Sequence, residues 1–278
     1  MIPREQRINA FIKLGKWLTL PDSVAVIDRW IESAYAANPW FTPDNVRQAL
    51  KKVANGFLDE QSLLQWSNQY ASIRSSKRIG VVMAGNIPAA GFFDALCVLV
   101  SGHTLLAKPS KSDTSLLRDL LTKLCEIEPR FESFVVWADK LTDADAFIAT
   151  GSDNTARYFE YYFAKKPHII RKNRVSVGVL SGHETLDELV RLGHDILDYY
   201  GFGCRNVAKL FVPQGYNWTP FFEAMEYFRL YCCSHHKFFN NYEYNRSVLL
   251  LNQSPHLENG FLIVLESRSL ISPISVVH

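Results

Sequence analysis

The sequence predicts an α/β fold with a doubly wound parallel sheet, followed by a second α/β region. Short apolar runs typical of buried parallel strands alternate with amphipathic helical segments from residue 78 onward. Turns that contain glycine or proline separate them, which indicates repeated crossover connections. A second strand and helix alternation begins near Val175, so we place the boundary between 172 and 173.

Residues 1–75 are predicted to be helical, and the sheet follows them. An apolar stripe around Ile8 and Phe11 opens the chain, and capping residues precede the later segments. Helices are expected at 23–36, 42–53, 57–70, 88–100, 112–127 and 152–163. Strands are expected at 78–84, 104–108, 133–136 and 146–150. Gly102 is expected to end one helix, and Ser112 or Asp113 to cap the next.

The second region repeats the alternation with less regular spacing. Strands are expected at 175–180, 209–212, 247–251 and 261–265, and helices at 185–199 and 218–230. The basic stretch 165–174 is short and interrupted by Pro167, so we interpret it as a solvated edge of the protein with at most one anion contact.

Composition excludes several classes of protein. The chain has 278 residues, 47% of them apolar, which suffices for a large buried core. Thirty basic and 28 acidic side chains leave a net charge of +2, which gives no reason to expect a nucleic-acid partner. No run approaches the roughly 18 apolar residues of a membrane span, and the N-terminus lacks a signal-peptide core. Five cysteines without framework spacing indicate reduced thiols, and we expect a cytoplasmic protein.

Two glycine or proline turns could bind an anionic ligand. At Gly85 and Asn86 a strand ends and a helix follows, and free backbone N–H groups at such a turn attract anions. Many α/β proteins contain such a turn for purely structural reasons. Lys108 ends the next strand, followed by Pro109 and Ser110, where an ammonium group suits a ribose hydroxyl or a phosphate. Taken alone, this segment favours a surface lysine.

Cys204 is the candidate nucleophile. It follows Gly201, Phe202 and Gly203, and a thiol in a glycine turn can be reached by a substrate. Thiolates are strong nucleophiles that suit thioester exchange, and Arg205 could favour the charged form. In isolation, a cysteine is more often a small buried apolar residue, which is how we interpret Cys97 and Cys125.

Other candidates are weaker. The ligands between Cys232 and His236 are too crowded for one helix face and have no second pair, so no metal site is predicted. His103, His183 and His194 are candidate bases without an identified partner.

Together and in order, these segments resemble the aldehyde dehydrogenase superfamily, and within it the acyl-CoA reductase family of the bioluminescence fatty-acid reductase type. The resemblance covers roughly residues 78–278. The stretch from Gly85 to Pro88 resembles the family's Asn-x-Pro loop, whose Asn serves the oxyanion hole. Lys108-Pro109-Ser110 resembles the strand-end motif that holds the adenosine ribose. Thr150-Gly151-Ser152 resembles the turn that meets the cofactor phosphates, and Gly201 to Cys204 resembles the nucleophile turn.

The resemblance implies a fold, a domain organisation and an activity. It implies an aldehyde-dehydrogenase-like fold, with a helical region and a Rossmann-type dinucleotide-binding domain at 1–172. The catalytic domain at 173–278 would be incomplete, because relatives continue beyond the position of His278. It implies NADPH-dependent reduction of a fatty acyl-CoA through an acyl-enzyme, a thioester on Cys204. Asn86 and Cys204 would be catalytic, and Gly85, Lys108, Ser110, Gly151 and Ser152 would bind the cofactor.

Three departures and several alternatives accompany this interpretation. The superfamily's general-base Glu should fall near 168–173, where none occurs, which fits a reductase that does not hydrolyse its acyl-enzyme. Ala156 replaces a glycine after the phosphate turn, and Glu266 matches a ribose-binding Glu only weakly. NADH in place of NADPH stays open, as do a homo-oligomer and an acyl-protein synthetase partner. The rival functions are reduction of an acyl phosphate, a truncated non-catalytic nucleotide-binding relative, and metal binding at Cys232 to His236.

Overall fold

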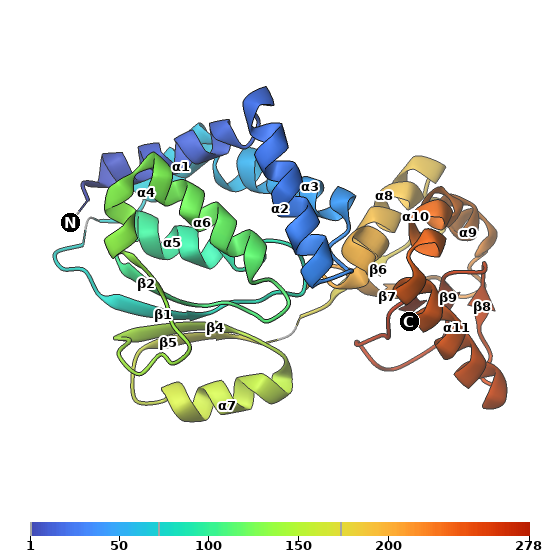
Figure 1. Ribbon diagram of the computed structural model, residues 1–278. Helices are drawn as coiled ribbons and strands as arrows, with labels where there is room; N and C mark the ends of the chain where they lie inside the picture. Colours follow the sequence, from blue (N-terminus) through green and yellow to red (C-terminus); the bar gives the residue numbers. More distant parts are fainter. Residues whose placement is uncertain (1, 72, 173) are drawn as a thin grey trace. The chain divides into compact units, whose positions relative to one another are not determined.

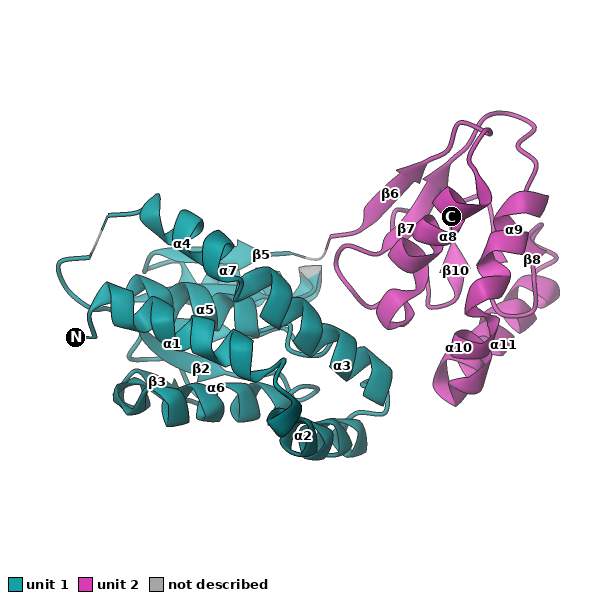
Figure 2. Ribbon diagram, turned by 90° about the horizontal axis from the view of Figure 1, so that it is seen from above, with its two compact units in different colours: residues 1–173 teal, residues 174–278 magenta. Residues whose placement is uncertain are grey.

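The computed structural model describes residues 2–71, 73–172 and 174–278. The chain divides into two compact units, Met1–Asn173 and Arg174–His278 (Figure 2). Within the described ranges, no helix has the length and apolar character required to cross a membrane.

A parallel sheet of five strands forms the centre of the first unit. The strands are β1 (Arg78–Val82), β2 (Thr104–Lys108), β3 (Val135–Trp137), β4 (Ala146–Thr150) and β5 (His168–Arg171). Their order is β3-β2-β1-β4-β5, and every neighbouring pair is parallel. The chain therefore changes direction across the sheet between β1 and β4, and ligands of open α/β sheets bind at the carboxyl ends of the strands at such a point.

Helices cover both faces of this sheet, as a doubly wound fold requires (Figure 1). On one face lie α5 (Phe92–Ser101) and α6 (Ser115–Ile127), under a layer made by α1 (Arg4–Trp17), α2 (Val24–Ala37), α3 (Pro43–Lys52) and α4 (Glu60–Asn68). On the other face lies α7 (Asp153–Phe163). Short 3₁₀ or π segments occupy Pro21–Ser23, Val53–Phe57 and Pro129–Ser133. The predicted fold class is confirmed.

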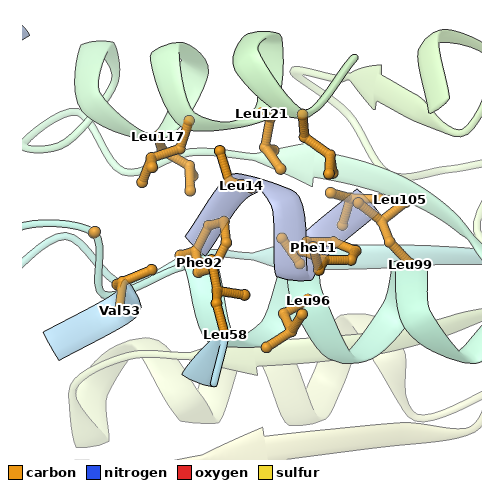
Figure 3. Close-up of a cluster of buried hydrophobic side chains, with 14 of the residues drawn as sticks. Phe11, Leu14, Val53, Leu58, Phe92, Leu96, Leu99, Leu105, Leu117 and Leu121 are labelled. Atoms are coloured by element: carbon orange, nitrogen blue, oxygen red, sulfur yellow. The ribbon is translucent and has the colours of Figure 1, made fainter. Parts of the chain in front are cut away.

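The main core of the first unit lies between the N-terminal helices and the sheet (Figure 3). Phe11 of α1 is fully buried and meets Phe92 and Phe131 edge to face, with ring centroids 6.3 and 5.7 Å apart. Leucines of α5 and α6, such as Leu99 and Leu117, surround this aromatic group. Because α1 packs on α5 and α6, the helical layer and the sheet share one core.

Two helix starts differ from the prediction. We expected a helix from Pro88, but α5 begins at Phe92, because residues 88–91 form a turn in which Ala89 has a φ of 58°. We expected Ser112 or Asp113 to cap the next helix, but α6 begins at Ser115 without a side-chain cap. The carboxylate of Asp113 instead accepts a hydrogen bond from the backbone of Ala89. Gly102, with a φ of 92°, ends α5 as expected.

The basic stretch that we interpreted as a solvated edge contains the strand β5. Phe147 to Thr150 of β4 pair with His168 to Arg171 of β5 in parallel. Short edge strands are hard to recognise from sequence, because half of their side chains face solvent and the pattern is too brief to show a period. Ile169 is accordingly 55% exposed.

The second unit is also α/β. It contains the parallel strands β6 (Ser176–Val179) and β7 (Val207–Phe211), and the short strands β8 (Leu257–Glu258), β9 (Ile263–Val264) and β10 (Val276–Val277). Its helices are α8 (Leu186–Leu197), α9 (Thr219–Met225), α10 (Arg229–Ser234) and α11 (His236–Leu251), with 3₁₀ turns at Asp198–Gly201 and Glu226–Phe228. His278 joins the two groups of strands, because it accepts from Leu210 N at 2.6 Å and donates to Ala208 O at 3.0 Å.

The strand expected at 247–251 is wrong, because these residues end the helix α11. A short apolar run cannot be assigned to a strand or a helix by its period alone. Tertiary contacts stabilise the helical conformation of α11. The Tyr242 hydroxyl donates to Glu258 at 2.8 Å, and Arg246 forms an ion pair with the same carboxylate at 2.8 Å. The helix expected at 218–230 is likewise divided, into α9, a 3₁₀ turn and α10.

Phe11→Ala should destabilise the first unit by about 3–5 kcal/mol, because it removes a fully buried aromatic side chain and leaves a cavity. Urea unfolding followed by circular dichroism would measure the change. The matched control is Tyr161→Ala, which removes an aromatic ring that is 79% exposed, and it should change the unfolding free energy by less than about 0.5 kcal/mol. Equal effects of the two changes would contradict the assigned core.

Candidate active site

Two of the candidate turns touch at the carboxyl edge of the sheet. Lys108 ends β2 opposite Val82 of β1, and Met83 N donates to Lys108 O at 3.0 Å. A Cβ added to the buried Gly85 would lie 2.4 Å from Ser110 Cβ, so only glycine allows this approach. The Asn86 turn and the Lys108-Pro109-Ser110 turn therefore form one surface. Asn86 and Lys108 are both exposed on it.

The third candidate turn follows the neighbouring strand β4. Ala149 of β4 lies opposite Val82, so Gly151 and Ser152 emerge at the same edge. Ser152 caps α7, because its hydroxyl accepts from Thr155 N at 3.4 Å. Gly151 N donates to Arg171 O at 3.2 Å, so this amide is engaged within the sheet. Gly151 contributes close packing, because an added Cβ would lie 3.0 Å from Phe159 Cε2.

A partly buried ion pair lies at the carboxyl end of β5, the strand next to β4. Asp94, in the first turn of α5, is 4% exposed and pairs with Arg171 at the end of β5. A cofactor with a 2′-phosphate would need a nearby cation, and Arg171 and Lys111 are two such side chains. Because the charge of Arg171 is already compensated by Asp94, the exposed Lys108 and Lys111 are the better candidates in the first unit.

The Asp113 carboxylate supports the Asn86 loop, a role that the sequence did not reveal. Its Oδ2 accepts from Ala89 N at 2.8 Å, three residues after Asn86. Asp113 is 4% exposed, and burial raises the pKa of its carboxyl group to about 6. In the sequence, Asp113 lies three residues after Ser110, at the start of a predicted helix. An aspartate at such a position predicts an ordinary helix cap, so the sequence gives no separate sign of the contact with Ala89.

Cys204 belongs to the second unit and lies in a tightly bent turn. Tyr199, Tyr200 and Gly201 have φ values of 53°, 58° and 78°, three successive residues in the left-handed region. The buried Tyr200 stacks on Tyr231 with ring centroids 4.4 Å apart, which helps to hold this bend. The Cys204 side chain is exposed, as a nucleophile requires.

Asn206 fastens the cysteine turn to the end of α8. Its Oδ1 accepts from Gly203 N at 2.7 Å. Its Nδ2 donates to Asp195 O at 2.8 Å and to Asp198 O at 3.1 Å. The side chain therefore binds backbone on both sides of the bend. The sequence analysis did not identify Asn206, because its partners lie up to 11 residues away.

The remaining cysteines differ from Cys204 in exposure. All five cysteines lie in described parts of the chain, and Cys204 alone is exposed. Burial raises the pKa of Cys97 and of Cys125 to about 11, and it also raises the pKa of the buried Cys232. These thiols are protonated at neutral pH and are poor nucleophiles.

Two of the candidate bases, His103 and His194, have structural partners, as does His235 of the Cys232 to His236 cluster. His194 Nδ1 lies 2.9 Å from Asp198 Oδ1 at the end of α8. His103 accepts from Lys77 N at 3.2 Å before β2, at the sheet edge opposite the candidate turns. His235 accepts from Phe238 N at 3.2 Å and so caps α11. Within residues 2–71, 73–172 and 174–278, no three His, Cys, Asp or Glu side chains are grouped as metal ligands.

The fold is that of the aldehyde dehydrogenases. A putative aldehyde dehydrogenase from Burkholderia cenocepacia has a TM-score of 0.67 and 14% identity, over 92% of this chain and 60% of that chain. A propionaldehyde dehydrogenase from Clostridium phytofermentans has a TM-score of 0.62 and 10% identity, over 81% and 55%. Proline utilization A from Corynebacterium freiburgense has a TM-score of 0.62 and 14% identity, over 81% and 24%. This chain therefore spans between about a quarter and three fifths of their lengths.

The family follows from the sequence comparison. A family model described as acyl-CoA reductase (LuxC) matches residues 31–221, more than half of the chain. The chain belongs to this family. The matched region contains all the candidate site residues, from Gly85 to Cys204. No curated protein matches the chain.

Asn206→Ala should destabilise the second unit by about 2 kcal/mol, because it leaves Gly203 N and the carbonyls at the end of α8 without a partner. Thermal unfolding would measure the loss. Asn241→Ala is the matched control, since Asn241 Nδ2 makes a single bond to Lys237 O within α11, and it should cost less than half as much. Equal losses would contradict the bracing role of Asn206.

Proposed function

We propose that this protein reduces an acyl-CoA, with a long fatty acyl group, to the aldehyde through a thioester on Cys204. The observation that carries the proposal is one exposed cysteine in a braced glycine turn, in a chain of the acyl-CoA reductase family. Reduction of an activated acyl group is the activity that this family name describes. The acyl-CoA substrate and the covalent step are part of the proposal.

The first chemical step is thioester exchange at Cys204. The Cys204 thiolate attacks the acyl carbonyl, forming a carbon–sulfur bond and a tetrahedral oxyanion. The carbon–sulfur bond to coenzyme A then breaks, and coenzyme A leaves as a thiolate that takes up a proton from solvent. One thioester replaces another, so the step needs no external energy source. The exposure of Cys204 supports this role, because the acyl chain and coenzyme A must both approach the sulfur.

The oxyanion of this step needs hydrogen-bond donors. We assign this role to the side-chain amide of Asn86 and to the backbone N–H of Cys204. Asn86 is exposed at the end of β1, in a loop fixed by Gly85 and by the bond from Ala89 to Asp113. A donor held by its surroundings stabilises developing charge without reorganising during the reaction.

A nicotinamide cofactor is implied by the family resemblance, and the residues at the sheet edge fit one. Lys108 and the start of α7 at Ser152 supply positive charge and helix-terminal N–H groups for anionic phosphates. Ser110 supplies a hydroxyl, and Gly85 and Gly151 leave the backbone without side chains at the turns. When bound, the cofactor supplies the hydride that reduces the acyl group. The exposed Lys108 and Lys111 favour NADPH over NADH.

The strand β5 supports reduction in place of hydrolysis. It occupies the stretch where the superfamily's general-base Glu is expected, and its residues from His168 to Arg171 contain no carboxylate. The nearby cation Arg171 forms an ion pair with Asp94. Without a base to activate water there, the acyl-enzyme would persist until hydride arrives.

Cys204→Ala should abolish formation of a covalent acyl adduct. In the unchanged protein, a long-chain acyl-CoA should add the mass of one acyl group, and NADPH should then remove it as aldehyde. Cys233→Ala is the matched control and should keep the adduct, because Cys233 is partly buried. Intact-mass spectrometry measures each state. An adduct in Cys204→Ala would overturn the proposed nucleophile. An adduct formed only from an acyl phosphate would reassign the substrate, and none from either donor would indicate a non-catalytic protein.

Asn86→Ala should slow adduct formation by about 10²–10³-fold, because one oxyanion donor is lost. The rate is measured by quenched-flow mass spectrometry at saturating acyl-CoA. Asn55→Ala, which removes an exposed amide elsewhere in the same unit, should leave the rate unchanged. A rate for Asn86→Ala within twofold of the unchanged protein would rule out the proposed donor.

A further inference from the structure

We propose that Asp113, in its ionised form, is a positioning residue that holds the Asn86 loop ready for catalysis. The inference rests on the proposed function, because the loop matters through the Asn86 amide. It extends that function by assigning a second residue, which itself contacts neither substrate nor cofactor. Asp113 acts through the backbone of Ala89, to which it is bound at 2.8 Å.

The geometry shows why the loop needs such support. Between β1 and α5, residues 88–91 are not helical, and Ala89 has a φ of 58°. An L-residue other than glycine adopts this left-handed conformation at an energetic cost, so a tertiary contact must maintain it. The contact is the bond from Ala89 N to Asp113 Oδ2, which joins residues 24 apart in the sequence.

A second contact holds the other end of the same loop. Gly85 packs against Ser110, where an added Cβ would lie 2.4 Å from Ser110 Cβ and 3.2 Å from Asp113 N. Asn86 lies between these two fixed points, Gly85 and Ala89. Both points contact the turn that follows β2. The backbone position of Asn86 is therefore set by the turn that carries Asp113.

The charge state of Asp113 determines the strength of this support. The pKa of the carboxyl group is raised to about 6, mainly by burial and to a smaller extent by Asp119 on α6, while hydrogen bonds from the amides of Ala89 and Leu117 lower it. Above that pH the group is a carboxylate, and hydrogen bonds to a charged acceptor are about twice as strong as those to a neutral one. Below it, the acid holds the Ala89 amide less firmly.

Because Asp113 is buried, its presence is not explained by a contribution to the stability of the folded chain. The carboxyl pKa is higher in the folded chain, about 6, than its ordinary value of 3.8. The free energy of unfolding therefore falls as the pH rises from about 4 to about 6, and it stays lower at neutral pH. Asp113 Oδ1 is buried and makes no hydrogen bond with any described residue. An ionised Asp113 is thus a net burden on folding, which fits a residue kept for function.

The test compares Asp113→Asn with the unchanged protein. Asparagine keeps the shape and can still accept from Ala89 N, but it cannot ionise. We expect Asp113→Asn to be as stable to heat at pH 7.5 as the unchanged protein, or more stable. We expect acylation of Cys204 by acyl-CoA to be about tenfold slower, with the change in kcat and not in KM. A lower stability with unchanged acylation would show that Asp113 is only a helix cap and would overturn the proposal.

The pH profile gives a readout that a helix cap would not alter. The quantity to measure is the ratio of the acylation rate to the rate at which iodoacetamide alkylates Cys204, because alkylation needs no oxyanion donor and the contribution of the thiol cancels in the ratio. In the unchanged protein, this ratio should fall about tenfold as the pH is lowered through about 6, because the Asp113 charge is lost. In Asp113→Asn the ratio should not change with pH.

A measurement without substrate separates this proposal from the proposed function. The amide proton of Ala89, observed by NMR in the ¹⁵N-labelled protein, should titrate with a midpoint near pH 6 and should not titrate in Asp113→Asn. An Ala89 amide that does not titrate overturns the assigned contact, whatever the enzyme does. Normal adduct formation, with a ratio of acylation to alkylation that changes with pH equally in both proteins, overturns the positioning role alone. Absence of any adduct in the unchanged protein overturns the proposed function, and the catalytic role of Asp113 with it.

Discussion

The parallel pairing of β1 with both β2 and β4 is the constraint on which the first unit depends. Val82 lies opposite Lys108 on one side and opposite Ala149 on the other. This register brings turns that are far apart in the sequence to one edge of the sheet. Asn86 and Ser152 could not share an edge without it, because the chain between them forms two α-helices and three strands. The candidate cofactor surface is a consequence of strand order.

Each unit holds its candidate turn with one polar side chain that binds backbone. In the first unit, Asp113 binds Ala89 N near Asn86, and in the second unit, Asn206 binds Gly203 N beside Cys204. Both turns contain residues with positive φ, where the backbone alone would relax into other conformations. A buried or partly buried polar side chain is expensive unless it is bonded, so these contacts are specific as well as stabilising. The conformation of each candidate turn therefore depends on a side-chain contact as well as on the turn's own backbone.

The ion pairs of the first unit limit which of its charged side chains could bind an anionic ligand. The first unit offers several cations near the sheet edge, and only the structure shows that Arg171 is paired with the buried Asp94. This pair links α5 to the edge strand β5. Lys108 and Lys111, by contrast, are exposed. Burial also distinguishes the cysteines from one another. It raises the pKa of Cys97 and Cys125, which keeps these thiols protonated, whereas Cys204 is exposed.

The sequence by itself determined the doubly wound class, most helices and strands of the first unit, and the turns at Gly85, Lys108 and Cys204. These features are local, because apolar period, glycine and proline act within a few residues. The tertiary structure decided the rest. It made 247–251 part of α11 through Glu258, added β5 as an edge strand, and moved the start of α5 to Phe92. It also gave Asp113, Asn206 and Arg171 their partners. These outcomes depend on hydrogen bonds and ion pairs between residues up to 77 positions apart, and no local pattern encodes such contacts.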